Sequence, residues 1–342
     1  MRSAFGETFD VPLGYLNTAS VGVPPTFVAD AMTEAIALWR TGSVQPPDYD
    51  KHVALARESW ARLVGVPPST VASGASVSQL IALVAAGLPE STRVLTVRQE
   101  FTSTTFPFAA MGLTVDEVPQ DELLSAVDGH DLVALSVAQS ADGWLAPLDD
   151  LREAASRAGA RVLLDATQAV GWLPLELDWA DWVVGACYKW LLSPRGAAWL
   201  AVHPSAGSLT RPLAANWYAG EDPWQTVYGL PLRLASDARR FDLSPVWFAQ
   251  FGAAAALPYL ADLDLHAVHD HNVRLADLTL EGLGLQPSGS AIISLDLPDA
   301  ASRLASAGAK VSVRAGRARL SYHLYNTDDD VQLVLDALSG HS

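Results

Sequence analysis

Two neighbouring segments carry most of the information in this chain: Arg161-Val-Leu-Leu-Asp-Ala-Thr-Gln-Ala-Val-Gly171 and Asp181-Trp-Val-Val-Gly-Ala-Cys-Tyr-Lys-Trp-Leu-Leu-Ser-Pro-Arg-Gly196. Each contains a short apolar run of the kind that forms a buried strand in a parallel sheet. The first run ends at Asp165, and Lys189 follows the second. Because open α/β sheets bind ligands at the carboxyl ends of their strands, we expect the acid and the lysine to face one site.

An acid and a lysine placed in this way predict a site for pyridoxal phosphate. Asp165 can keep the pyridinium nitrogen of this cofactor protonated, and Lys189 can form an imine with its aldehyde, so that the ring accepts electrons from a substrate carbanion. Lys189 alone among the lysines has dense apolar and aromatic neighbours, and desolvation there lowers the pKa of its amine. The alternatives are a helix-capping aspartate and a solvated loop lysine.

Composition narrows the class of protein. Half of the 342 residues are apolar, which is enough for a sizeable core and roughly two domains. There are 22 Lys and Arg against 38 Asp and Glu, and the formal charge of -16 disfavours nucleic acid and anionic membranes as partners. The single cysteine forms no internal disulfide, and no signal segment or membrane span is recognisable. We expect a cytoplasmic protein with no metal site.

The order of apolar patterns predicts an α/β fold. Short apolar strands alternate with helical periodicity through the first part of the chain, which favours a mostly parallel sheet in a large domain over 1–240. Beyond it we expect a small α+β domain over 241–342. The expected strands are 94–97, 115–118, 132–137, 162–164, 182–185 and 197–202, and the expected helices are 25–39, 52–64, 76–88, 148–158 and 245–260.

Two further segments are expected at the site. Ser73-Gly-Ala-Ser-Val-Ser78 precedes an apolar helix, where the Ser76 hydroxyl and backbone N–H groups can bind a phosphate, although a simple helix cap is the alternative. The stretch 204–240 is rich in Pro, Gly and Trp, and we expect its loops to lie over the site.

Taken in order, five segments make the chain resemble the class V aminotransferase-fold enzymes that use pyridoxal phosphate, a group with cysteine desulfurases, kynureninase and several carbon-sulfur lyases. The resemblance covers nearly the whole chain and implies the PLP-dependent transferase fold of type I. The segments are Tyr15-Leu-Asn-Thr-Ala-Ser20, Ser73-Gly-Ala-Ser76, Asp165-Ala-Thr-Gln168, Tyr188-Lys189-Trp190 and Arg319-Leu-Ser-Tyr-His-Leu-Tyr-Asn-Thr327.

The resemblance implies a set of cofactor contacts. Asp165 would pair with the pyridine nitrogen, Gln168 with the ring hydroxyl, and Lys189 would hold the aldehyde carbon. Phosphate would bind Ser76, the amide of Ala75, and Tyr188, because the kynureninase branch has a phosphate-binding tyrosine where the desulfurases have histidine.

The resemblance also implies roles for residues outside the segments around Asp165 and Lys189. Phe101 lies where the family stacks a residue on the cofactor ring, and it can stack but not transfer protons; a core phenylalanine is the alternative. Arg319 matches the arginine that binds the substrate carboxylate, with a surface ion pair as the alternative. Ser244 matches a threonine given to the phosphate site of a partner subunit, which implies a homodimer. Asn17 and Trp217 are expected on the substrate side, where Trp217 is alternatively a packing residue.

Departures from the family pattern bear on the reaction. No cysteine lies in the loop before Arg319, where desulfurases carry the catalytic thiol, and Cys187 is expected to be a small buried residue. Ala75 replaces a hydroxyl residue of the phosphate turn, at a cost of roughly 1 kcal/mol for one hydrogen bond.

These observations predict an enzyme that acts on an α-amino acid through an external aldimine. Lys189 would abstract the α-proton; return of the proton to the cofactor carbon gives transamination, loss of a β-substituent gives a lyase, and return to the α-carbon gives epimerisation. The Tyr-Lys-Trp-Leu-x-x-Pro-Arg-Gly pattern also resembles the carbon-sulfur lyase of ergothioneine synthesis, which is the alternative. A PLP-binding regulator without catalysis is disfavoured, because such regulators usually carry a DNA-binding domain.

Overall fold

Seven strands form the central sheet of the protein. The structure is a computed structural model and describes residues 1–338. Among these strands only β9 runs against the others, because it pairs antiparallel with both of its neighbours. The expected mostly parallel α/β sheet is therefore confirmed. Across the sheet the order is β3 (Val71–Gly74), β9 (Ala198–Val202), β8 (Trp182–Ala186), β7 (Arg161–Asp165), β6 (Leu132–Ser136), β4 (Arg93–Val97) and β5 (Thr114–Val118).

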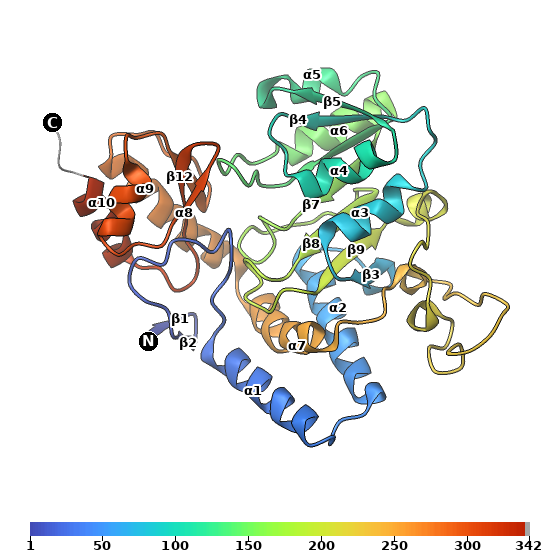
Figure 1. Ribbon diagram of the computed structural model, residues 1–342. Coiled ribbons are helices and arrows are strands. Elements are labelled where there is room, and N and C mark those ends of the chain that lie inside the picture. Colours follow the sequence, from blue (N-terminus) through green and yellow to red (C-terminus); the bar gives the residue numbers. More distant parts are fainter. Residues whose placement is uncertain (339–342) are drawn as a thin grey trace.

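Helices cover both faces of this sheet (Figure 1). Alternate strand residues point to opposite faces, so that in β7 Leu163 packs with one set of helices, whereas Val162 and Leu164 pack with the other. Burial on both sides explains the continuous apolar runs in the sequence. The first face carries α3 (Val77–Ala85) and α4 (Thr102–Ala110), and the second carries α2 (Asp50–Val64), α5 (Leu123–Ala126), α6 (Leu148–Ala158) and α7 (Trp247–Asp262).

The C-terminal part has a separate antiparallel sheet and its own apolar cluster. In Figure 1 it lies to one side of the large sheet, in orange and red. Helix α7 packs instead against α2 and against α1 (Thr26–Arg40), and the domain division at residue 240 stays a prediction. The elements of this part are β10 (Ile292–Leu295), β12 (Arg317–Ser321) and β11 (Ser312–Arg314), in sheet order, with α8 (Leu265–Gly282), α9 (Ala300–Ser306) and α10 (Asp328–Leu338).

The N-terminal segment passes between the two parts. After the hairpin of β1 (Arg2–Ala4) and β2 (Glu7–Phe9), Leu16 donates its N–H to the carbonyl of Lys310 and accepts from the N–H of Ser321. Gly22 then donates to the carbonyl of Tyr188 at 2.9 Å, and a Cβ on Gly22 would collide with the backbone of Lys189. The N-terminal segment therefore connects the loop that carries Tyr188 and Lys189 to the C-terminal sheet.

Strand β3 and helix α4 are not among the elements expected from the sequence. Strand β3 is short and ends in Ser-Gly, and α4 contains three threonines and Pro107, so neither segment has a clear periodic pattern. The expected helix 76–88 is α3, shorter at both ends, with Ser76 as its N-cap. Six short 3-10 helices complete the described chain: η1 (Pro46–Tyr49), η2 (Pro68–Thr70), η3 (Gln120–Glu122), η4 (Pro204–Leu209), η5 (Trp217–Ala219) and η6 (Ala238–Phe241). Within residues 1–338, no helix has the length and apolar character needed to span a bilayer.

Candidate active site

Lys189 lies in the loop that follows β8, at the carboxyl edge of the sheet. Its Nζ atom is 5.3 Å from the centroid of the Phe101 ring and 5.6 Å from that of the Tyr188 ring. Burial lowers the pKa of this amine to about 8, although the nearby carboxylate of Asp165 opposes the shift. At pH 7 roughly a tenth of the amine is therefore unprotonated, far more than for an ordinary lysine, and this fraction can act as a nucleophile or a base.

Asp165 ends the neighbouring strand β7 and is also buried. Its Oδ1 accepts the backbone N–H of Thr167 at 2.8 Å, and its Oδ2 accepts the hydroxyl of Thr104 at 3.4 Å. Burial raises the pKa of the carboxyl, while the Thr167 hydrogen bonds and the charge of Lys189 lower it. A buried acid held in this way can pair with a protonated ring nitrogen.

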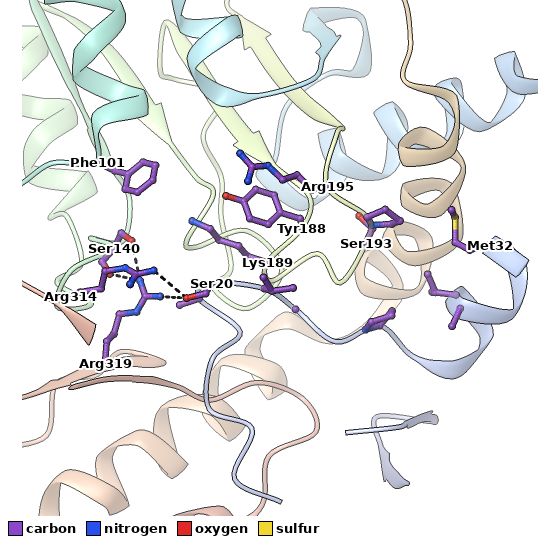
Figure 2. A pocket seen from close by; sticks show the side chains of 17 residues that line it. Ser20, Met32, Phe101, Ser140, Tyr188, Lys189, Ser193, Arg195, Arg314 and Arg319 are labelled. Atoms are coloured by element: carbon purple, nitrogen blue, oxygen red, sulfur yellow. Dashed lines mark hydrogen bonds between the residues drawn. The ribbon is translucent and has the colours of Figure 1, made fainter. Parts of the chain in front are cut away.

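Two cavities meet at Lys189. The inner cavity, of about 150 Å³, is lined by Asp165, Gln168, the turn before α3 and Tyr188. The outer cavity, of about 410 Å³, is shown in Figure 2; it extends from Arg314 and Arg319 past Lys189 to the apolar side of α1. Phe101, Ser140, Tyr188, Lys189 and Arg195 line both cavities.

The turn before α3 has the geometry of an anion site and of a helix cap at once. Ser76 caps α3 by accepting the N–H of Gln79 at 3.4 Å, which leaves its hydroxyl hydrogen free to donate. The amide of Ala75 donates weakly to the Gln79 side chain at 3.3 Å. Both residues line the inner cavity, so this turn can cap the helix and also bind a phosphate.

A buried ion pair holds this turn from behind. Asp242 accepts the backbone N–H of Ser73 at 2.8 Å and the guanidinium of Arg57 at 2.6 Å. Burial raises the pKa of the Asp242 carboxyl to about 6, and Arg57 acts against that rise. Sequence reasoning missed this pair, because its members lie 185 residues apart.

Gln168 is placed at the inner cavity, but its amide is already engaged. Its Nε2 donates to the carbonyl of Ala19 at 3.0 Å and to the hydroxyl of Ser140 at 3.1 Å, and its Oε1 accepts from Trp190 at 2.8 Å. An amide nitrogen has two hydrogens. A bond donated by Gln168 to the ring oxygen of the cofactor would replace one of these two contacts, and that bond stays a prediction.

Phe101 is 42% exposed and borders both cavities, which disfavours the core alternative. Glu100 fixes the backbone beside it, by accepting the N–H of Phe101 at 2.7 Å and two bonds from Ser136 at 2.8 and 2.6 Å. Burial raises the pKa of the Glu100 carboxyl, and these hydrogen bonds oppose the rise. Glu100 is thus a positioning residue that sequence reasoning missed.

Arg319 is 1% exposed and reaches the outer cavity from β12. Its guanidinium donates to the carbonyl of Ser140 at 2.7 Å and to the hydroxyls of Ser140, Ser20 and Ser312 at 3.1, 2.7 and 3.1 Å. No carboxylate within residues 1–338 pairs with it, so the surface ion-pair alternative is not observed. Burial, with a smaller contribution from Arg314, lowers the pKa of Arg319 to about 10.

Three expected residues lie away from the two cavities. Asn17 pairs with Ser321 by a backbone bridge but lines neither cavity. Trp217 packs on Tyr218 and Trp224 in a loop. Ser244 is exposed between η6 and α7. Their roles toward a substrate or a partner subunit stay predictions.

The loops of 204–240 do not lie over the cavities, contrary to expectation. None of these residues lines the inner or the outer cavity. Part of the stretch projects from the body in Figure 1, with Tyr228 and Leu230 exposed. The expectation rested on composition, which identifies loops without giving their direction.

Cys187 is buried, as expected, and donates its thiol to the carbonyl of Pro194 at 2.9 Å. Burial raises the pKa of this thiol. It lines neither cavity. The chain therefore offers no reactive thiol at Lys189.

The residues present fit pyridoxal phosphate. A lysine with a lowered pKa, a buried acid, an aromatic ring and a helix N-terminus surround one cavity, and each suits a different part of that cofactor. Sequence reasoning missed Ser20, Ser140 and Arg195. Ser20 and Arg195 lie within recognised segments, whereas Ser140 lies in none of them. Fold and site together define a pyridoxal phosphate-dependent enzyme of fold type I.

Comparison with known proteins gives the family. The model of the aminotransferase class-V family matches residues 48–295, and the chain belongs to this family. It is 24% identical to the uncharacterized aminotransferase YcbU of Bacillus subtilis, over 83% of this chain and 82% of that protein. It is 26% identical to an isopenicillin N epimerase of Amycolatopsis lactamdurans, over 97% and 96%.

Solved structures share the fold. A cystine C-S lyase, C-DES, in complex with cysteine persulfide has a TM-score of 0.83 at 19% identity, covering 97% of this chain and 99% of that one. The cysteine desulfurase CsdA from Escherichia coli has a TM-score of 0.82 at 20% identity, covering 96% and 95%.

Proposed function

We propose that this enzyme acts on a free α-amino acid, with Lys189 moving the proton of the α-carbon and Arg319 binding the carboxylate. The observation that carries the proposal is the position of Lys189, where the inner cavity beside Asp165 meets the outer cavity beside Arg319. The amine that acts on a bound amino acid thus lies between an acid for the cofactor and a cation for the substrate.

The residues of this chain have separable tasks. Asp165 would hold positive charge at the ring nitrogen of pyridoxal phosphate, Phe101 would pack on the ring, and Ser76 and Tyr188 would bind the phosphate. Pyridoxal phosphate, when bound, supplies an electron sink for the bonds of the α-carbon. Lys189 would hold the cofactor in the absence of substrate and would move a proton when substrate is bound, for which an amine of pKa about 8 is suited.

The lining favours reactions that need one proton carrier. Burial lowers the pKa of Lys189 to about 8, whereas that of Arg319 is about 10, burial raises the pKa of Tyr188, and Phe101 has no proton to transfer. Transamination and β-elimination can both use one lysine. We therefore infer an aminotransferase first and a carbon-sulfur lyase second, with the ergothioneine type as one form of the lyase.

The lyase candidate has its own support. The fold is shared with a cystine C-S lyase, and the buried thiol of Cys187 disfavours a desulfurase that stores sulfur on the protein. The assembly of Lys189, Asp165 and Arg319 around connected cavities disfavours a regulator without catalysis. The expected homodimer, with Ser244 contributed to a partner, and the cytoplasmic location belong to this proposal.

An amino-acid panel tests the proposal. The purified holoenzyme is incubated with each amino acid, with and without a 2-keto acid acceptor, and pyruvate, ammonia and new amino acids are measured. An aminotransferase forms product only with an acceptor, whereas a lyase releases pyruvate and ammonia without one. Reaction with no amino acid in either format would contradict the proposal.

A further inference from the structure

Two arginines converge on the hydroxyl of Ser20. Arg319 Nη2 donates to Ser20 Oγ at 2.7 Å, and Arg314 Nη2 approaches the same atom at 3.4 Å (Figure 2). Both arginines line the outer cavity, and no Asp or Glu is among its lining residues. Two positive charges thus share a neutral acceptor, although like charges repel at this range.

Several N–H and O–H groups of Arg319, Arg314 and Ser20 are free to donate to a ligand. Four of the five N–H groups of Arg319 have acceptors, and one on Nη2 remains. Arg314 uses two, on Ser20 and on the carbonyl of Val313, and three remain. Ser20 Oγ accepts from both arginines, so its own hydrogen is free as a third kind of donor.

The hairpin of β11 and β12 brings Arg314 to this point. Ala315 and Gly316 form its tip with φ angles of 47° and 80°, and Arg314 pairs with Arg317 across it. Arg317 forms an ion pair with Asp296 and does not line the outer cavity, whereas Arg314 has no ion pair within the described chain. One hairpin thus carries a paired arginine and an unpaired one.

We propose that Ser20 and Arg314 form, together with Arg319, a three-donor carboxylate site, and that Arg314 selects substrates that are free acids over amines, amides and esters. A carboxylate has two oxygens and accepts about four hydrogen bonds, and the five free donors of the two guanidinium groups and the hydroxyl are enough to supply them. The inference rests on the proposed function, since it assigns further residues to the same substrate.

The test uses two probes that need no knowledge of the substrate. Aminooxyacetate and O-methylhydroxylamine differ by one carboxylate. Each would attack the cofactor carbon that is bound to the Lys189 nitrogen, form a new C=N bond to that carbon and release the lysine amine. The rates of the spectral change are measured with the holoenzyme. The quantity of interest is the ratio of the two rates, because it cancels changes in the intrinsic reactivity of the cofactor.

We expect the wild type to prefer aminooxyacetate, and Arg314→Met to reduce that ratio roughly tenfold or more, as for loss of a charged hydrogen bond. Ser20→Ala should reduce it less, and the control Arg317→Met should keep the wild-type ratio. An equal ratio in Arg314→Met and Arg317→Met, or no preference in the wild type, would overturn the inference. A wild type that reacts with neither probe would instead refute the proposed function.

Discussion

The amine of Lys189 lies 5.3 Å from the centre of the Phe101 ring, across the space where the inner and outer cavities meet. The ring is held at this distance by Glu100, which binds the backbone N–H of Phe101 and two groups of Ser136. A flat heteroaromatic ligand attached to the lysine can therefore pack on the phenyl ring.

Lys189→Ala should abolish covalent attachment of the cofactor. The wild type should show visible absorption and a borohydride-reducible adduct on Lys189, because only this lysine is buried beside an acid. Peptide mass spectrometry after reduction locates the adduct, with Lys51→Ala as the control. The same adduct in the Lys189→Ala protein would show the assignment to be wrong.

Attachment of pyridoxal phosphate to the apoprotein should depend on pH through the state of Lys189. Burial lowers the pKa of this amine from 10.5 to about 8. The unprotonated amine is the nucleophile, so the attachment rate should rise as pH increases through about 8 and level off above it. Stopped-flow absorbance from pH 6.5 to 9.5 measures this. A rate still rising steeply at pH 9.5 would mean that the pKa is not lowered.

Arg319→Leu should leave the cofactor spectrum intact and raise the apparent substrate constant. The guanidinium is buried without a carboxylate, and its loss removes the partner of a desolvated substrate charge, which costs roughly 2 to 4 kcal/mol. Steady-state kinetics separates this effect from kcat. An unchanged apparent constant would move the carboxylate contact to another residue.

Arg195→Gln should weaken binding of pyridoxal phosphate but not of pyridoxal. Arg195 lies 5.0 Å from the centroid of the Tyr188 ring and lines the inner cavity with Ser76, where a phosphate would meet its charge. We expect a loss of roughly tenfold for the phosphate form. Arg240→Gln is the matched control, because Arg240 also lies over a ring, that of Phe241, away from both cavities. Equal losses for both cofactor forms would exclude a phosphate contact.

Cys187→Ala should retain most activity. The thiol is buried against the carbonyl of Pro194 and its pKa is raised, so it is a poor nucleophile. The expected packing cost is about 1 kcal/mol. Activity and intact mass after turnover are compared with the wild type. A persulfide on Cys187 together with an inactive variant would place the protein with the desulfurases by mechanism.

The sequence predicted the parts of the site that follow from local pattern. Asp165 and Lys189 each follow an apolar run, and parallel strands put their carboxyl ends at one edge, so their proximity was predictable. Strand β3 and helix α4 were not, because Val71–Gly74 is short and Thr102–Ala110 has weak periodicity. Tertiary packing decides the structure of such segments.

The contacts that orient the site could not be predicted in the same way. The bonds from Arg319 to Ser20 and Ser140 join residues 299 and 179 positions apart, and no periodicity relates them. The turn of Ser73 depends likewise on Asp242. The direction in which a loop leaves the body of the protein was also unpredictable. Part of the stretch 204–240 projects outward and does not cover the cavities.

The passage of the N-terminal segment between Lys310, Ser321 and the lysine loop has a consequence for biosynthesis. Leu16, Ala19 and Ser20 find their partners at residues 310, 321 and 319, and the last two pairs are separated by 302 and 299 residues in the sequence. Contacts of such sequence separation form late and slow the search for the native state. The strands of the large sheet all precede residue 203 and can assemble before residues 310–321 are synthesised, but the substrate side of the enzyme cannot. Acquisition of carboxylate selectivity, timed against cofactor absorbance, would then report the moment at which residues 16–20 meet residues 310–321.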